Sequence, residues 1–76
     1  MKKTIKKIQK RKDVIICIER GNMQGYTFGE IRQYIRNKKG TYEPSQKGFT
    51  FSPVILKDLI DGLKDLKKSF SEDNLL

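Results

Sequence analysis

Residues 26–36 alternate strictly between two kinds of side chain, and this alternation constrains the fold of the 76-residue chain more than any other feature. Odd-numbered positions are small, aliphatic or neutral, whereas even-numbered positions are aromatic or charged. A period of two over this length is typical of a β-strand with two different faces. We expect the odd-numbered set on the helix-covered side. The set expected on the open, ligand-facing side is Tyr26, Phe28, Glu30, Arg32, Tyr34 and Arg36.

Three further strands are predicted around this segment. Residues 14–20 are a run of mostly β-branched, apolar side chains, which favours a buried central strand. After a glycine turn, residues 41–43 form a short strand that Pro44 stops or confines to an edge. Residues 47–51 form the last strand, with two phenylalanines on one face.

A helix is predicted to begin at Ser52 and Pro53 and to run to about Ser69. Serine is a good N-cap, and proline at the first helical position loses no hydrogen bond. Leucine and isoleucine recur at steps of three and four up to Phe70, which gives one apolar stripe. The expected fold class is α+β: a curved, four-stranded antiparallel sheet followed by one C-terminal helix (ββββα). Because one helix covers only one face of a sheet, the other face is solvated, paired with a second subunit or loaded with ligand.

Charge and length divide the chain into a flexible basic arm (residues 1–11), one folded domain (residues 12–70) and a frayed tail (residues 71–76). The formal net charge is +8, and residues 1–12 hold seven bases and no acid. Such an excess predicts a polyanionic partner. A chain of this length has a thin core, so we also expect a homodimer.

The composition argues against an enzyme. There is no histidine, the usual residue for proton transfer at neutral pH and for metal binding. The single cysteine, Cys17, lies in an apolar run and predicts core packing in a reducing, intracellular compartment. Asp58, Asp61 and Asp65 alternate with lysines and indicate a solvated helix face rather than a metal site. No cofactor is implied, and no apolar run is long enough for a membrane span.

Bases and aromatic residues interleave on the predicted sheet, as in proteins that hold unpaired nucleic acid strands. There, lysine and arginine contact phosphates while bases stack on aromatic rings. We expect Arg32 and Lys47 on the same surface. The alternative is that the tyrosines fill a dimer interface and the bases serve solubility. The candidate nucleic-acid-binding residues are Lys10, Lys12, Arg20, Tyr26, Arg32, Tyr34, Arg36 and Lys47.

The segments Ile31-Arg32-Gln33-Tyr34 and Lys47-Gly48-Phe49-Thr50-Phe51-Ser52-Pro53 have the spacing of a known pattern. They resemble the core of the transcriptional positive cofactor four family, single-stranded-DNA-binding transcriptional coactivators with a Whirly-like fold. The resemblance covers about residues 10–68 and implies a homodimer of curved sheets, each backed by a helix, with single-stranded DNA crossing the sheets.

The resemblance also assigns residues. Arg32 and Lys47 match DNA-contacting bases of the family, and Lys10 and Lys12 fall near basic residues of its first strand. The chain departs from the pattern at three positions: Ile35 replaces a stacking tryptophan, while Glu43 and Gln46 replace bases. The absence of a serine-rich arm favours a bacterial or phage protein of the cytoplasm or nucleoid over a nuclear one.

The function expected from the sequence is therefore sequence-tolerant binding of single-stranded DNA by a dimeric sheet, as a transcriptional cofactor or as an accessory of replication or repair. One alternative is a coregulator module that binds transcription or replication proteins through its helix or arm. Another is an RNA binder that uses the same face, because nothing in the sequence reads a 2′-hydroxyl.

Overall fold

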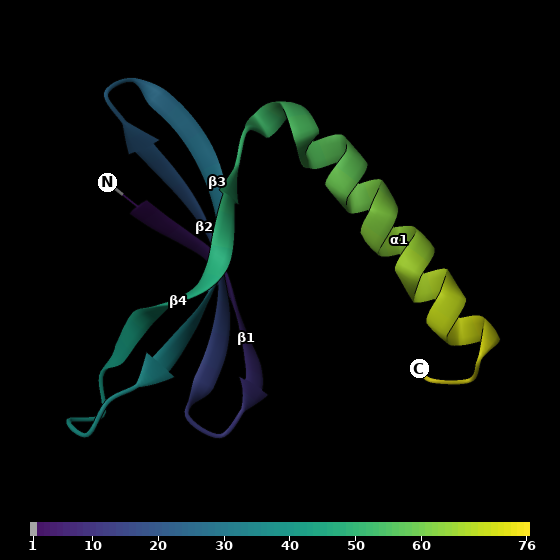
Figure 1. The fold of residues 1–76 in the computed structure, drawn as a ribbon, viewed down its shortest axis with the longest axis horizontal. Helices are drawn as coiled ribbons and strands as arrows, with labels where there is room; N and C mark the ends of the chain where they lie inside the picture. Colours follow the sequence, from purple (N-terminus) through teal and green to yellow (C-terminus); the bar gives the residue numbers. More distant parts are fainter. Residues whose placement is uncertain (1) are drawn as a thin grey trace.

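The computed structural model describes residues 2–76 as one antiparallel sheet followed by a helix (Figure 1). This confirms the predicted fold class of four antiparallel strands and a C-terminal helix. The strands lie in the order β1-β2-β3-β4, so each neighbours the next along the chain. The elements are β1 (Lys2–Arg11), β2 (Val14–Met23), β3 (Tyr26–Arg36), β4 (Tyr42–Phe51), the 3₁₀ turn η1 (Pro53–Ile55) and α1 (Leu56–Glu72).

The basic arm expected at residues 1–11 is, from Lys2 onward, an edge strand rather than a flexible segment; Met1 lies outside the described residues. β1 pairs with β2 from Lys2, opposite Gly21, to Arg11, opposite Val14. Its charge pattern hid the strand, because lysine-rich sequence reads as a solvated arm. Lysines are nevertheless common on edge strands, where they discourage pairing with a further chain.

The two short strands expected on either side of Pro44 are one strand, β4. The chain accommodates the proline because β4 is an edge strand, and such a strand tolerates a missing N–H. The pairing with β3 shifts register between Arg32 and Tyr34, whose partners are Gly48 and Pro44. The helix also continues to Glu72, so the segment expected to be frayed begins within its last turn.

The sheet has two chemically different faces, which we call inner and outer. The inner face carries Cys17 and Glu19 of β2, which pair with Arg32 and Glu30 of β3. Cys17 is 2% exposed and Glu30 is 3% exposed. No helix covers this face, so these side chains are enclosed by the curvature of the sheet and by their own neighbours.

The outer face has an apolar centre, with basic residues on β1 and at Arg20 beside it. By strand alternation it carries the side chains of the residues that flank the inner-face positions. The rings of Phe49 and Phe51 lie 5.9 Å apart there, and Phe49 is 48% exposed. The outer-face apolar residues of β2, β3 and β4 are Val14, Ile16, Ile18, Ile31, Ile35, Phe49 and Phe51.

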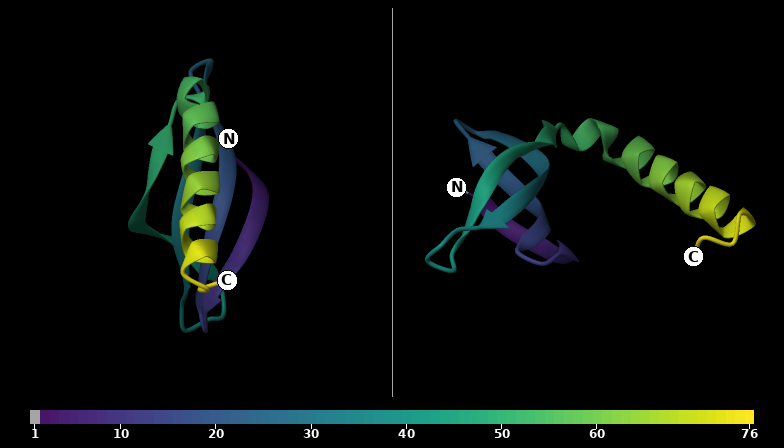
Figure 2. Two further views of the ribbon diagram at one scale, coloured as in Figure 1. Left: turned by 90° about the vertical axis from the view of Figure 1, so that its right-hand side faces the viewer. Right: turned by 60° about the horizontal axis from the view of Figure 1, so that its bottom comes forward.

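Helix α1 does not cover either face of its own sheet, which corrects the expectation of a helix-covered side. It leaves the sheet after Ser52 and extends away from it (Figures 1 and 2). No residue of α1 is buried, and Leu63, in the middle of the apolar stripe, is 54% exposed. The stripe is the one predicted, but a single chain supplies nothing to pack against it. Among residues 2–76, no helix combines the length and apolarity that crossing a membrane requires.

We predict that Gly48→Ala destabilises the protein by about 2 kcal/mol or more, which is typical of overpacking. A methyl group at Gly48 would lie 2.6 Å from the Ile31 carbonyl oxygen and 2.7 Å from the Arg32 Cα atom, so backbone must move. Gly62→Ala is the matched control, since its methyl group meets nothing within 4 Å. Alanine is the better helix former by about 1 kcal/mol, so Gly62→Ala should stabilise. Urea unfolding measures both; equal effects would contradict the close approach of β3 and β4.

Candidate nucleic-acid interface

Strand β3 supplies most of the candidate interface, because its even-numbered residues share the inner face as the alternation predicted. Their register with β2 and β4 shows this, since Arg32 lies opposite Cys17 on one side and Gly48 on the other. From one end of β3 to the other, the set reads Tyr26, Phe28, Glu30, Arg32, Tyr34 and Arg36. Aromatic and charged groups therefore follow one another along a single strand.

The Glu30 carboxylate holds two cations in place on the inner face. Lys2 Nζ lies 3.0 Å from Glu30 Oε1, and Arg32 Nε donates to Glu30 Oε2 at 2.5 Å. Burial alone would raise the pKa of Glu30, but the hydrogen bonds and charges of Arg32 and Lys2 outweigh it and hold this pKa below its ordinary value. Arg32 Nη1 also donates to the Ser45 carbonyl oxygen at 2.9 Å. The guanidinium is thus oriented before any ligand arrives.

The Glu19 carboxylate orients Tyr34 in the same way. The Tyr34 hydroxyl donates to Glu19 Oε1 at 2.7 Å, and the Thr4 hydroxyl donates to Glu19 Oε2 at 3.0 Å. Burial and then the Glu19 carboxylate raise the pKa of Tyr34 to about 12. The hydroxyl therefore stays protonated at neutral pH, and the ring is fixed on the inner face next to Arg32.

The inner face keeps a modest positive charge after these pairings. Four bases lie on it, namely Lys2, Lys7, Arg32 and Arg36, against the two carboxylates of Glu19 and Glu30, which leaves +2. Lys7 lies opposite Cys17, where its charge acts on the thiol. Burial, followed by the nearby Glu19, raises the pKa of Cys17, so the thiol is a packed core group rather than a nucleophile.

The remaining candidates lie elsewhere. Arg20 alternates with the inner-face residues of β2 and therefore extends from the outer face. Lys47 lies between Pro44 and Gly48, where the register of β4 with β3 shifts, so the strand pairing assigns it to neither face. Its expected place on the same surface as Arg32 stays a prediction. Lys10 donates to the Gln33 side-chain oxygen on the outer face. Lys12 lies in the turn between β1 and β2. The contribution of each of these bases to binding stays a prediction.

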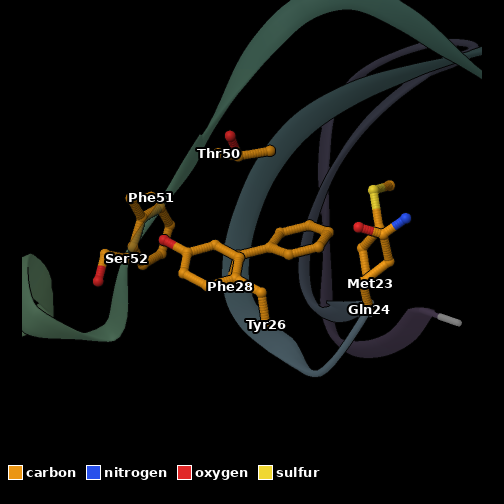
Figure 3. A pocket seen from close by; sticks show the side chains of 7 residues that line it. All are labelled: Met23, Gln24, Tyr26, Phe28, Thr50, Phe51 and Ser52. Carbon is orange, nitrogen blue, oxygen red and sulfur yellow. The ribbon is translucent and has the colours of Figure 1, made fainter.

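An aromatic recess lies at the other end of the sheet, next to the β2–β3 turn and the end of β4, and residues of both faces line it. It has a volume of about 540 Å³ and is lined by Met23, Gln24, Tyr26, Phe28, Thr50, Phe51 and Ser52 (Figure 3). Tyr26 is 59% exposed there. Rings with exposed faces of this kind can stack on bases.

Sequence reasoning found the bases and rings but missed Glu19, Glu30, Lys2 and Thr4. Their partnerships join residues up to 28 positions apart and depend on the pairing of β1, which the sequence did not reveal. The one available signal was a carboxylate in each of two strands otherwise suited to burial. Unpaired acids in such positions are rare, so each implies a partner.

We predict that Tyr34→Phe removes a tyrosine titration with a pKa of about 12, measured by tyrosinate absorbance. The folded pKa is raised above 10.0, so the stability that Tyr34 contributes is complete below pH 10 and declines between pH 10 and about pH 12. In that window the free energy of unfolding should fall less steeply in Tyr34→Phe than in the wild type. Tyr26→Phe, which changes an exposed ring, is the control and should keep the titration at about pH 12. If that titration disappears in Tyr26→Phe and persists in Tyr34→Phe, the Tyr34–Glu19 hydrogen bond is contradicted.

Neither a family model nor a curated protein matches the sequence. Solved structures do match. A PC4 homologue from Burkholderia pseudomallei in its orthorhombic crystal form gives a TM-score of 0.81 at 26% identity, over 86% of this chain and 88% of that one. Its tetragonal form gives 0.83 at 25% identity, over 88% and 98%.

A bacteriophage T5 homologue of the eukaryotic transcription coactivator PC4, implicated in recombination-dependent DNA replication, gives a TM-score of 0.65. It is 15% identical over 99% of this chain and 83% of that one, so it speaks for the fold alone. The likeness to the Burkholderia protein extends over most of both chains in either crystal form. The chain described here therefore shares the fold of these PC4 homologues and is similar in sequence to the Burkholderia protein.

Proposed function

We propose that this protein binds single-stranded DNA without strong sequence preference, on the inner face of its sheet, as a transcriptional cofactor or an accessory of replication or repair. The likeness to PC4 homologues supports a DNA-binding or cofactor role in general terms. The finer proposal, unpaired DNA on this particular face, depends on the geometry of the inner face.

The observation that best supports this proposal is the inner face itself, which is cationic and aromatic and is not covered by the helix of the same chain. Arginine has five N–H donors, and Arg32 uses two of them on Glu30 and Ser45, which leaves the others for a phosphate. Tyr34 is held beside it, and Tyr26 and Phe28 follow toward the aromatic recess. Phosphate contacts combined with stacking bind single strands of any sequence, since every base has a π-face.

The form of the inner face favours an unpaired strand over a duplex. Duplex readers extend a helix or a β-ribbon into a groove. Here the binding groups lie on the face of a sheet, around Glu30, which is 3% exposed, and no element of this face extends outward to enter a groove. A flexible single strand can follow such a surface and expose its bases to the rings, whereas stacked base pairs keep theirs covered.

The same proposal includes a homodimer, because the outer face and the stripe of α1 leave too much apolar surface exposed. The buried apolar residues among residues 2–76 are Val14, Ile15 and Cys17. Each stripe leucine or isoleucine covered by a second copy contributes about 1.5–3 kcal/mol. A dimer that packs the outer faces and helices together would leave both inner faces open to DNA.

We predict that Arg32→Ala weakens binding of oligo-dT by about tenfold and lowers the slope of log K against log salt by about 0.7, the value for one phosphate contact. The loss should be similar for other sequences, because a phosphate contact reads none. Fluorescence anisotropy over a range of salt concentrations measures both quantities.

Lys68→Ala is the control for this experiment, since it removes one charge from the C-terminal half of α1, which extends away from the sheet (Figure 1). Arg20→Ala distinguishes the faces, because Arg20 extends from the outer face: a larger loss of affinity there than at Arg32 would place the DNA strand on the outer face. Duplex DNA that competes equally with oligo-dT would overturn the unpaired-strand proposal. RNA that competes better would favour an RNA binder instead.

We predict that Leu63→Gln converts the dimer to monomers at micromolar concentration and that Lys64→Gln does not. The two variants introduce the same residue at adjacent positions, but only Leu63 belongs to the apolar stripe. Light scattering coupled to size-exclusion chromatography measures the mass. A monomeric wild type would contradict the dimer and would leave the stripe available to a different protein, as in a coregulator module.

A further inference from the structure

Two turns lie next to each other at the end of the sheet opposite the aromatic recess. They are the β1–β2 turn at Lys12 and Asp13 and the β3–β4 turn at residues 37–41 (Figure 1). The backbone N–H of Arg36 donates to the Asp13 carbonyl oxygen at 2.9 Å and ties them together. A recess of about 240 Å³ lies between them, lined by Lys12, Asp13, Arg36, Asn37, Lys38 and Gly40.

This turn recess, as we call it, is strongly cationic. Five bases belong to the two turns and their flanks, against the two acids Asp13 and Glu43, which leaves +3 within a short stretch of surface. Glu43 belongs to this surface because it accepts a hydrogen bond from the Asn37 side chain at 3.0 Å. Lys38 comes from one turn and Lys12 from the other, so the recess is cationic on both sides. The five bases are Arg11, Lys12, Arg36, Lys38 and Lys39.

The β3–β4 turn is built to hold the Arg36 guanidinium in place. Gly40 has a φ of +86°, which favours glycine, and a methyl group there would lie 3.3 Å from Arg36 Nη2. The absence of a side chain thus lets the guanidinium lie across the turn. Asn37 Oδ1 accepts hydrogen bonds from the backbone N–H groups of Lys39 at 2.9 Å and Thr41 at 3.0 Å, which fixes the turn.

Asp13 is the one carboxylate among the residues that line the turn recess, and it holds Arg36 only weakly. Asp13 Oδ1 lies 3.6 Å from Arg36 Nη1, with the two side chains 45% and 51% exposed. Exposed ion pairs of this kind contribute at most about 1 kcal/mol. A phosphate group, which can accept two parallel N–H bonds from one guanidinium, is a stronger partner for Arg36.

We propose that the turn recess binds a phosphate of the DNA strand as the strand leaves the inner face, and that this phosphate displaces Asp13 from Arg36. The inference rests on the proposed function. Arg36 is both the last inner-face residue of β3 and part of the turn recess, so the cationic surface continues from one to the other. The strand is thereby held at a second point beyond Arg32.

The most direct test is Asp13→Asn, which removes the competing charge and keeps the shape of the side chain. Asp13 has a φ of 63°, a left-handed conformation that asparagine also adopts readily, so the turn is retained. Removing an exposed competitor should tighten binding of oligo-dT about two- to fivefold. An affinity equal to or lower than that of the wild type would overturn the proposal.

The complementary test is the double variant Lys12→Gln/Lys38→Gln, which should weaken oligo-dT binding about tenfold and lower the salt slope by about 1. The matched control is Lys57→Gln/Lys64→Gln, which removes the same charge from α1 and should leave the affinity unchanged. Equal losses in the two double variants would mean a general charge effect and would overturn a defined site.

NMR titration with inorganic pyrophosphate distinguishes a strand phosphate from a free one. The proposal expects weak shifts of the amides of Asp13 and residues 37–40 that oligo-dT reproduces at far lower concentration. Shifts with pyrophosphate but not with oligo-dT would indicate a site for free phosphate compounds and would overturn the proposal that the turn recess binds a phosphate of the DNA strand. If Arg32→Ala weakens DNA binding while the Asp13 and lysine variants change nothing, the turn recess fails and the proposed function stands.

Discussion

The pairing of buried Glu30 with Lys2 and Arg32 is the interaction on which the inner face depends. A carboxylate that is 3% exposed is costly unless cations and hydrogen bonds compensate it. One of its cations comes from β1 and the other from β3, with β2 between them. The charge at the centre of the sheet therefore requires the lysine-rich segment to be a strand, since a free arm would leave Glu30 half paired.

The same pairing sets what the inner face can recognise. Glu30 and Glu19 consume part of the positive charge but fix Arg32 and Tyr34 in one orientation, so little side-chain freedom is lost when a strand binds. The remaining N–H groups of Arg32 suit phosphate oxygens, which carry no sequence information. A net charge of only +2 on this face also means that, if DNA binds there as proposed, groups at the ends of the face add much of the attraction. That is why the turns next to Arg36 matter.

The sequence was sufficient wherever a local pattern decides the structure. The alternation of residues 26–36 predicted β3 and its two faces, and Ser52 with Pro53 predicted the start of the helical segment, where Ser52 is the N-cap. The sequence was insufficient for β1. Its many lysines predicted a solvated, flexible arm, whereas pairing with β2 makes the segment a strand. Likewise, an apolar stripe on α1 shows that something must cover it but not whether the cover comes from the same chain. The carboxylate network depends on the register of three strands, which no single segment encodes.

The exposed helix stripe and outer face connect folding to function. A chain whose buried apolar residues are Val14, Ile15 and Cys17, among those described, gains little stability from its own core. If a second copy covers the stripe, folding and association are one equilibrium, and stability rises with protein concentration. The resulting dimer then has two inner faces. A strand bound at one face is held close to the other, so the second contact becomes intramolecular and overall affinity exceeds that of a single face.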